Sequence, residues 1–495
     1  MFSSHNHTGC SCRKLAEGLL LSALLCFTTG SLAKAQESFS SMAFSQYTRA
    51  DGLPHNTVHH IMQDSYGFMW FSTRKGVSRY DGSEFETFST DSDSSLALSA
   101  NLVWATLEDD NHNIWIGTKN GGLNRYNPFQ NKVYHYFAEE NNPESISANT
   151  ITALAKDGEG TVWVGTEGGG LNRINAHKTP KENESTYTFD HFTPGKQKGA
   201  DVLLDIATDI NNNLWIATYG GGVYSFDVDK KTFEALWERI PALSNLQNAF
   251  VMSVEIEHED VLWIGTKYQG AYRVDFKQES WQHFNKDRSG GKRLSNNFVW
   301  DIYIDNEGRK WISTYGGGIN IIYNDAANYE YSIDHIQPQI DEEDTLPDNY
   351  IMQVMQDAGG MFWIATDNSG FATISTGQGL IDLPLRDEAE SLVRHHTINK
   401  LLELDSGRLM AASNDGLIDL NLVQGSAEKI DLNERSNKVY DLKKDNEHSH
   451  IIWLATNHGL VKYDIEAKNH KTFLPEVLEE YPGTDRLFSL QIDSS

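Results

Sequence analysis

Tryptophan recurs along the chain at a nearly constant interval, and a tryptophan ring is a platform on which a sugar can stack. The first seven of these residues stand 45, 48, 52, 48, 48 and 52 positions apart. A feature that repeats so regularly is typical of a packed scaffold rather than of one binding site. We therefore interpret the set as packing anchors of structural repeats: Trp70, Trp115, Trp163, Trp215, Trp263, Trp311, Trp363 and, after a gap, Trp453.

Three further patterns could in another context hold a phosphate or a metal. The glycine triplets at 168–170, 220–222 and 316–318 lack the Lys-Ser or Lys-Thr pair and the helix of a phosphate loop, so they are predicted to be hairpin turns. The acidic turns at 109–113 and 209–213 lack the distal glutamate of an EF-hand calcium loop and are predicted strand reversals. The histidines show no zinc-site spacing. We expect neither a metal nor a cofactor.

Catalysis is the rival class of function. The segment from Asp64 to Trp70 resembles the Asp box of sialidases, but Gly67 stands one residue later than that motif requires. There is no G-x-S-x-G nucleophile motif, and the carboxylates cannot be paired from the sequence of so acidic a chain. The chain is therefore expected to have no enzymatic activity of its own.

The elements that position these residues are short strands. The stretch from Ile114 to Tyr126, IWIGTKNGGLNRY, recurs in nine versions, each preceded by an apolar strand and an Asp–Gly turn and followed by an aromatic strand. Short β-branched and aromatic runs bounded by Gly, Asn and Asp predict strands and hairpins. Four strands in about 50 residues predict one blade of a β-propeller.

Seven regular repeats are followed by two less regular ones. We expect an all-β fold with a seven-bladed propeller at 36–385 and a partial second propeller at 386–495, comprising two blades and the start of a third. A single ring of nine or ten blades is the alternative. The segment from Phe44 to Tyr47 is expected to supply the outer strand that closes the first ring. Residues 485–493 repeat the inner-strand pattern just before the chain stops, which indicates a truncated chain.

The first 35 residues resemble an export signal. Arg13 and Lys14 precede an apolar run at 19–27, which is shorter than the roughly 20 residues that span a bilayer, and an A-K-A cleavage pattern follows at 33–35. All three cysteines, Cys10, Cys12 and Cys26, lie in this leader, so the mature chain would have no disulfide. We expect a periplasmic or other extracytoplasmic location. The formal charge of −28 excludes nucleic acid as a probable partner.

The segment from Asp51 to Gly82, with the repeated N-x-V/I, D-x-x-G and W-I/V-G/A-T-x-x-G-G-L-N-R elements, resembles the two-component regulator propeller repeats of bacterial hybrid histidine kinases and some diguanylate cyclases. The resemblance implies two seven-bladed propellers, a β-sandwich, a transmembrane helix and a cytoplasmic kinase or cyclase. The parts after the propellers are missing here, so membrane contact and phosphorelay output would depend on segments beyond residue 495.

A ligand site is expected where the repeats differ, because a scaffold repeats and a site does not. The mouth of a propeller channel, where inner strands and turns converge, is the favoured place. The candidate residues are His59, Trp104 and Trp300 on inner strands, and Arg74, Lys119, Tyr219, Tyr268 and Tyr315 after the tryptophan strands.

Two functions stay open at this point. One is ligand sensing, with an oligosaccharide or other small molecule as partner and a homodimer left open; the other is a stand-alone scaffold for interaction or adhesion.

Overall fold

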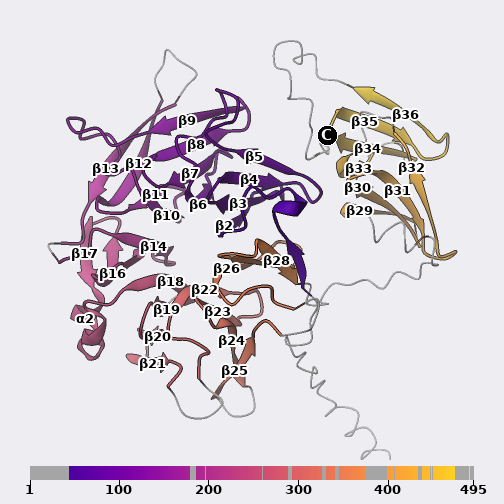
Figure 1. The fold of residues 1–495 in the computed structure, drawn as a ribbon. Coiled ribbons are helices and arrows are strands. Elements are labelled where there is room, and N and C mark those ends of the chain that lie inside the picture. The colour runs from indigo at the N-terminus through magenta and orange to yellow at the C-terminus, as the bar shows by residue number, and fades with distance from the viewer. Residues whose placement is uncertain are drawn as a thin grey trace, which may run out of the picture. The chain divides into compact units, whose positions relative to one another are not determined.

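The fold consists of short antiparallel strands in four-stranded sheets (Figure 1). The computed structural model describes residues 44–178, 185–195, 197–258, 260–287, 293–325, 330–339, 345–374, 389, 398–405, 407–432, 438–445, 448, 450–473 and 490. The predicted signal peptide and the predicted domain boundary near residue 385 lie outside these residues and stay predictions. Among the residues described, no helix has the length and apolar character needed to cross a lipid bilayer.

Blades 1 to 3 each follow chain order from the inner to the outer strand. They are β2 (Val58–Gln63), β3 (Met69–Thr73), β4 (Gly76–Tyr80) and β5 (Phe85–Phe88); β6 (Val103–Glu108), β7 (Ile114–Thr118), β8 (Leu123–Asn127) and β9 (Lys132–Tyr136); and β10 (Ile151–Lys156), β11 (Val162–Thr166), β12 (Gly170–Lys178) and β13 (Ser185–Phe192).

Blades 4 to 6 repeat this order. They are β14 (Leu203–Thr208), β15 (Leu214–Thr218), β16 (Gly222–Asp227) and β17 (Thr232–Ala235); β18 (Val251–His258), β19 (Val261–Thr266), β20 (Ala271–Asp275) and β21 (Ser280–Phe284); and β22 (Val299–Ile304), β23 (Lys310–Thr314), β24 (Gly318–Asp325) and β25 (Glu330–Ile336).

Blade 7 combines β26 (Ile351–Gln356), β27 (Phe362–Thr366) and β28 (Phe371–Ile374) with β1 (Ser45–Tyr47). Two further sheets follow in the chain: β29 (Ile398–Asp405), β30 (Arg408–Ser413), β31 (Gly416–Asn421) and β32 (Ser426–Ile430); and β33 (Val439–Lys444), β34 (Ile451–Thr456), β35 (Gly459–Asp464) and β36 (Asn469–Phe473).

The inner strands of the first seven blades lie side by side in the order β2, β6, β10, β14, β18, β22 and β26, and β26 lies beside β2 again (Figure 1). These blades therefore surround a common axis. In the later sheets, β29 lies beside β33 in the same way. The predicted all-β fold built from four-stranded propeller blades is confirmed.

The ring is closed by a strand from the start of the described chain. β1 pairs antiparallel with β28, with Ser45 opposite Thr373, so the predicted closing strand near 44–47 is confirmed. The turn before β28 fits against this strand only with glycine, because Gly370 has a φ of +77° and a Cβ there would lie 1.9 Å from the carbonyl oxygen of Tyr47. The short helix η2 (Arg49–Asp51) follows and is capped by Thr48.

Tyr47 is expected to contribute measurably to this closure. Its ring stacks on Phe371 with centroids 4.8 Å apart and planes inclined by 8°. Replacing Tyr47 by alanine is expected to lower the free energy of unfolding by about 2 kcal/mol, measured by urea denaturation with circular dichroism. The control is Phe129→Ala, since Phe129 is 67% exposed on a loop. Equal effects of the two substitutions would contradict the closing role.

The recurring Asp and Trp of each repeat form a hydrogen bond. The indole Nε1 donates to the carboxylate six residues earlier, as in Trp70 to Asp64 at 2.8 Å, while the other carboxylate oxygen accepts the backbone N–H of Phe68 at 2.9 Å. Blade 5 uses Glu257, which accepts from Trp263 at 2.9 Å. The carboxylate thus fixes the turn to the second strand. The same bond joins Trp115 to Asp109, Trp163 to Asp157, Trp215 to Asp209, Trp311 to Asp305, Trp363 to Asp357 and, with a longer turn, Trp453 to Asp445.

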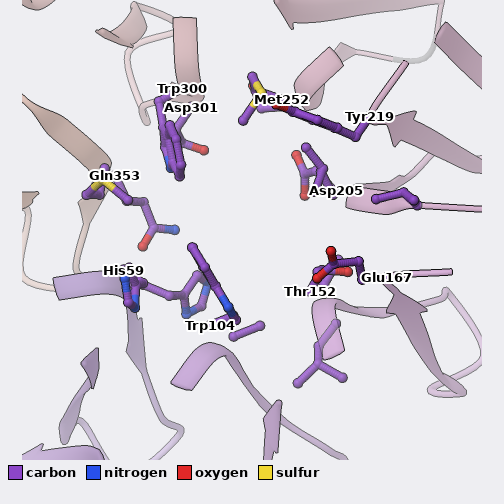
Figure 2. Close-up of a pocket in the computed structure, with 18 of the residues that line it drawn as sticks. His59, Trp104, Thr152, Glu167, Asp205, Tyr219, Met252, Trp300, Asp301 and Gln353 are labelled. Atoms are coloured by element: carbon purple, nitrogen blue, oxygen red, sulfur yellow. The ribbon is translucent and has the colours of Figure 1, made fainter. Parts of the chain in front are cut away.

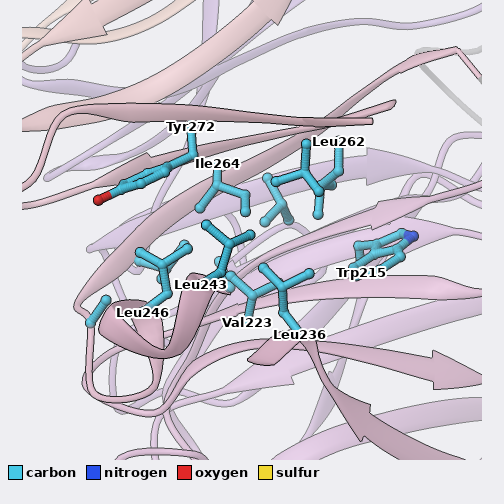
Figure 3. Close-up of a cluster of buried hydrophobic side chains, with 13 residues drawn as sticks. Trp215, Val223, Leu236, Leu243, Leu246, Leu262, Ile264 and Tyr272 are labelled. Atoms are coloured by element: carbon cyan, nitrogen blue, oxygen red, sulfur yellow. The ribbon is translucent and has the colours of Figure 1, made fainter. Parts of the chain in front are cut away.

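The connection between blades 4 and 5 is helical. The short helices α2 (Leu236–Arg239) and η3 (Pro241–Leu246) fill the connection from β17 to β18. Figure 3 shows Leu236, Leu243 and Leu246 packed on side chains from both blades, including Val223 and Ile264. This helical connection, residues 236–250, is one residue longer than the segments 89–102 and 137–150, which enter blades 2 and 3 without a helix.

Candidate functional site

A cavity of about 480 Å³ lies on the axis of the ring (Figure 2). Every inner strand has a β-bulge after its first residue, which leaves one residue out of the ladder. These extra residues all line the cavity: His59, Trp104, Thr152, Leu204, Met252, Trp300 and Met352. The bulge therefore gives each blade one variable side chain at the same place.

Aromatic rings occupy two parts of the wall. His59 stacks on Trp104 with centroids 4.3 Å apart. Trp300 lies 5.6 Å from Phe298 and 5.7 Å from Tyr315. Figure 2 shows Trp104 and Trp300 on different sides of the open centre. The cavity thus offers two indole rings from blades 2 and 6.

The histidines of blade 1 are neutral near pH 7, because burial lowers the pKa of both His59 and His60 to about 4. His59 Nδ1 lies 2.8 Å from the carbonyl oxygen of Val103, so this nitrogen carries the proton. His60 Nδ1 lies 3.1 Å from the hydroxyl of Thr106. Neither ring adds positive charge to the cavity.

Polar and charged side chains follow the second strands at the mouth of the cavity. Lys119, Glu167, Tyr219 and Lys267 each come directly after the threonine that ends such a strand, and all four line the cavity. The Lys267 ammonium donates to the Tyr219 hydroxyl at 2.8 Å and lies 5.6 Å from the centre of the Phe298 ring. The mouth therefore presents both signs of charge beside aromatic rings.

Two acidic residues, Asp205 and Asp301, lie in the cavity wall, and Glu255 interacts with both. Asp205 accepts hydrogen bonds from the backbone N–H of Ile206 at 2.8 Å and of Val254, on the next inner strand, at 2.9 Å. Burial nevertheless raises its pKa to about 6. Burial and the charge of Asp205 raise the pKa of Asp301 to about 8, and Asp301 Oδ2 is buried without a hydrogen-bond partner. Burial, with the charges of Asp205 and Asp301, raises the pKa of Glu255 well above its ordinary value.

The link from Asp205 to the next blade recurs elsewhere. Gln353 Oε1 accepts the backbone N–H of Ile61 at 2.6 Å and so joins blade 7 to blade 1. Asp441 of β33 accepts the N–H of Leu490 at 2.9 Å. Asp205 and Gln353 therefore do two things: each joins its inner strand to the next one, and each lines the cavity.

The structure brings some of the predicted site residues together and separates others. His59, Trp104, Lys119, Tyr219 and Trp300 line the cavity.

Arg74 and Tyr315 lie outside the cavity wall and both contact Asp367. The Arg74 guanidinium lies 3.4 Å from the Asp367 carboxylate, and the Tyr315 hydroxyl donates to it at 2.8 Å. Tyr268 is 63% exposed and lines a different groove.

Sequence reasoning missed the acidic wall. Asp205 and Asp301 stand inside otherwise apolar strands, LLDIAT and VWDIYI, and an acidic residue at such a position is the signal that was available. Glu167 and Lys267 share the position of Tyr219 in their own repeats. Among the described residues, no three His, Cys, Asp or Glu side chains are grouped as a metal site would require.

Comparison with known proteins assigns the repeats. A family described as two-component regulator propeller matches residues 52–75, 97–120, 145–168 and 293–316. These four segments match two-component regulator propeller repeats. The matched segments cover the entry to a blade, its inner strand and its second strand in blades 1, 2, 3 and 6.

Solved propeller structures share the fold. The extracellular domains of two hybrid two-component systems from B. thetaiotaomicron align with TM-scores of 0.55 and 0.52 at 20% and 19% identity, over 88% and 87% of this chain and 55% and 53% of theirs. PorZ, a surface component of the type-IX secretion system of Porphyromonas gingivalis, aligns with a TM-score of 0.50 at 15% identity, over 86% of this chain and 59% of PorZ. The chain thus spans between half and three fifths of the length of these structures.

A curated relative matches a short part. Histidine kinase P4 of Formosa agariphila is 35% identical over 66 residues, which is 13% of this chain and 5% of that protein.

Proposed function

We propose that this chain is the ligand-sensing part of an extracytoplasmic signalling receptor, and that its ligand binds in the axial cavity of the ring. The observation that carries the proposal is the cavity wall, where the bulge position of a repetitive scaffold holds five different types of side chain in seven blades: histidine, tryptophan, threonine, leucine and methionine. A cavity of about 480 Å³ lies within the range of small-ligand pockets. The two-component regulator propeller repeats support a role in signalling.

The wall favours a small carbohydrate. Trp104 and Trp300 provide flat apolar faces, while Thr152, Glu167 and Asp205 provide polar groups that can bond to hydroxyls. The protein's net negative charge disfavours a strongly anionic ligand.

A route for signal transfer follows from the same residues. Asp205 faces the cavity and also holds the inner strand of the next blade through Val254 N–H. A ligand that bonds to this carboxylate alters the contact between blades 4 and 5. Such a change can reach a kinase or cyclase only if the ligand binds one arrangement of the blades more tightly than another.

The test is a thermal-shift screen of the full chain with neutral and acidic oligosaccharides, followed by calorimetry on any that bind. Trp104→Ala and Trp300→Ala are each expected to weaken binding at least about tenfold, because each removes an indole face. Phe129→Ala, on an exposed loop, is the matched control and is expected to bind normally. Binding that both cavity variants retain would contradict the proposed site.

A scaffold role is the second candidate, and the shared fold with a secretion-system surface component favours it. The scaffold role predicts that no oligosaccharide binds in the axial cavity, and that the chain binds a protein partner instead.

A further inference from the structure

In blades 2, 3 and 6 the same small hydrogen-bond network joins the third and fourth strands to the segment that enters the blade. An asparagine of the third strand accepts the backbone N–H of a serine in the segment that enters the blade, and a histidine of the fourth strand bonds to a carbonyl of that segment. The asparagines are Asn124, Asn172 and Asn320, at 2.9, 2.9 and 2.7 Å from the serine nitrogens; the histidines are His135, His191 and His335, with Nε2 at 2.9, 2.6 and 2.9 Å from the carbonyl oxygens.

A glycine beside this network leaves no room for a side chain. A Cβ added at Gly121 would lie 2.5 Å from Ala100 Cβ, and one added at Gly169 or Gly317 would lie 2.3 or 2.7 Å from a serine Oγ. The entering segment therefore packs directly against the turn in these three blades.

Blade 5 departs from this arrangement at the asparagine and at the glycine. Tyr272 stands where the others have asparagine, Gln269 stands where they have glycine, and the helical connection supplies Asn245. Asn245 Nδ2 donates to Gln269 Oε1 at 3.0 Å and lies 2.9 Å from the Tyr272 hydroxyl, which donates to Gln269 Oε1 at 2.9 Å. His283 is retained, but its Nε2 now bonds to the Gln269 carbonyl oxygen at 2.5 Å.

These substitutions open a groove of about 400 Å³ on blade 5 that is separate from the axial cavity. Trp281 and Tyr268 line it and are 41% and 63% exposed. Val133 of blade 2 and Phe189 of blade 3 occupy the position of Trp281 on the fourth strand. They are only 6% and 4% exposed. Inter-blade packing therefore does not account for an indole at this place.

The lining of the groove indicates the class of ligand. Amide side chains of Asn245, Gln269 and Asn285 line the groove together with the two exposed rings, and no lysine or arginine is among the described residues that line it. Asp287 adds a carboxylate. An anion would thus find no counter-charge, whereas a molecule with flat apolar faces and many hydroxyls matches both the rings and the amides.

We propose that this groove is a second binding site, for a neutral oligosaccharide, formed where the helical connection between blades 4 and 5 and Gln269 replace the hydrogen-bond network of blades 2, 3 and 6. It is independent of the axial site, so ligand binding at one does not require the other.

The test uses the full chain with cellotetraose, laminaritetraose, mannotetraose and chitin tetrasaccharide at millimolar concentration, measured by saturation-transfer NMR and calorimetry. At least one is expected to bind. Trp281→Val and Tyr268→Asn introduce the residues that blade 2 carries as Val133 and Asn120, so both variants are expected to fold. Each is expected to weaken that binding at least about tenfold.

Two controls separate this site from the axial one. Trp300→Ala is expected to leave binding in the groove unchanged, and Phe129→Ala changes neither site. The proposal is overturned if none of the four saccharides binds, if binding survives both groove variants, or if only Trp300→Ala abolishes it. The last result would assign the ligand to the axial cavity and leave the function proposed there intact.

Discussion

Replacing Trp163 by alanine is expected to lower the free energy of unfolding by about 4 kcal/mol. The side chain is fully buried and packs against residues of the next blade, including Leu203 and Ile216. Its ring lies 5.5 Å from that of Phe226, and its Nε1 donates to Asp157 at 2.8 Å. Alanine therefore opens a cavity between two blades and leaves a buried carboxylate oxygen without its donor.

Two further variants separate packing from hydrogen bonding. Trp163→Phe retains much of the ring but removes the donor, and is expected to cost about 1–3 kcal/mol. Trp281→Val, at a partly exposed tryptophan, is expected to change stability by no more than about 0.5 kcal/mol. Urea unfolding followed by circular dichroism measures all three. A cost of Trp163→Ala as small as that of Trp281→Val would exclude an anchoring role.

The second expected effect is a gain in stability from Asp301→Asn at alkaline pH. The pKa of Asp301 is raised to about 8 in the folded chain, by burial and by the charge of Asp205. A carboxyl group whose pKa is higher in the folded chain than in the unfolded chain contributes its full stabilisation below the unfolded pKa, which is near 4. This contribution is lost as the pH rises from there through the folded pKa of about 8. Wild-type stability should therefore fall between pH 5 and pH 9, and the neutral asparagine should remove part of that fall.

The expected difference at pH 9 is about 2 kcal/mol in favour of the variant. Each pKa unit corresponds to at most about 1.4 kcal/mol, so the rise from near 4 to about 8 sets an upper limit above this value. We expect less than that limit because Asp301 faces the solvent-accessible cavity. An amide is tolerated at this position, as Gln353 shows in blade 7. Asp91→Asn, on an exposed turn, is the control for charge removal. Parallel pH profiles for wild type and Asp301→Asn would contradict the assignment.

The blades could be predicted because their signals are local. The spacing of the tryptophans and the Asp–Gly turns depends on neighbours within one hairpin, and so does the pairing of β2 with β3. The bond from Trp70 to Asp64 was not predicted, since the sequence shows the two residues but not that the hairpin brings indole and carboxylate together.

The lining of the axial cavity could be predicted only in part. His59, Trp104 and Trp300 line it and occupy equivalent positions of a repeat, whereas Tyr268 was selected by the same rule and lies in another groove. The difference arises from the helical connection between blades 4 and 5, whose sequence LWERIPALSNL is too short and too interrupted by proline to show a helical period.

The closing strand also determines the order in which the molecule can fold. Gln46 of β1 donates its side-chain amide to the carbonyl oxygen of Ser369, across a separation of 323 residues. The strand synthesised first among the described elements is thus paired last, and contacts of such long range are slow to form. Until blade 7 is complete, β1 and β28 are open edges that can pair with another chain. Aggregation during biosynthesis should therefore increase with the time between the synthesis of β1 and its pairing with β28.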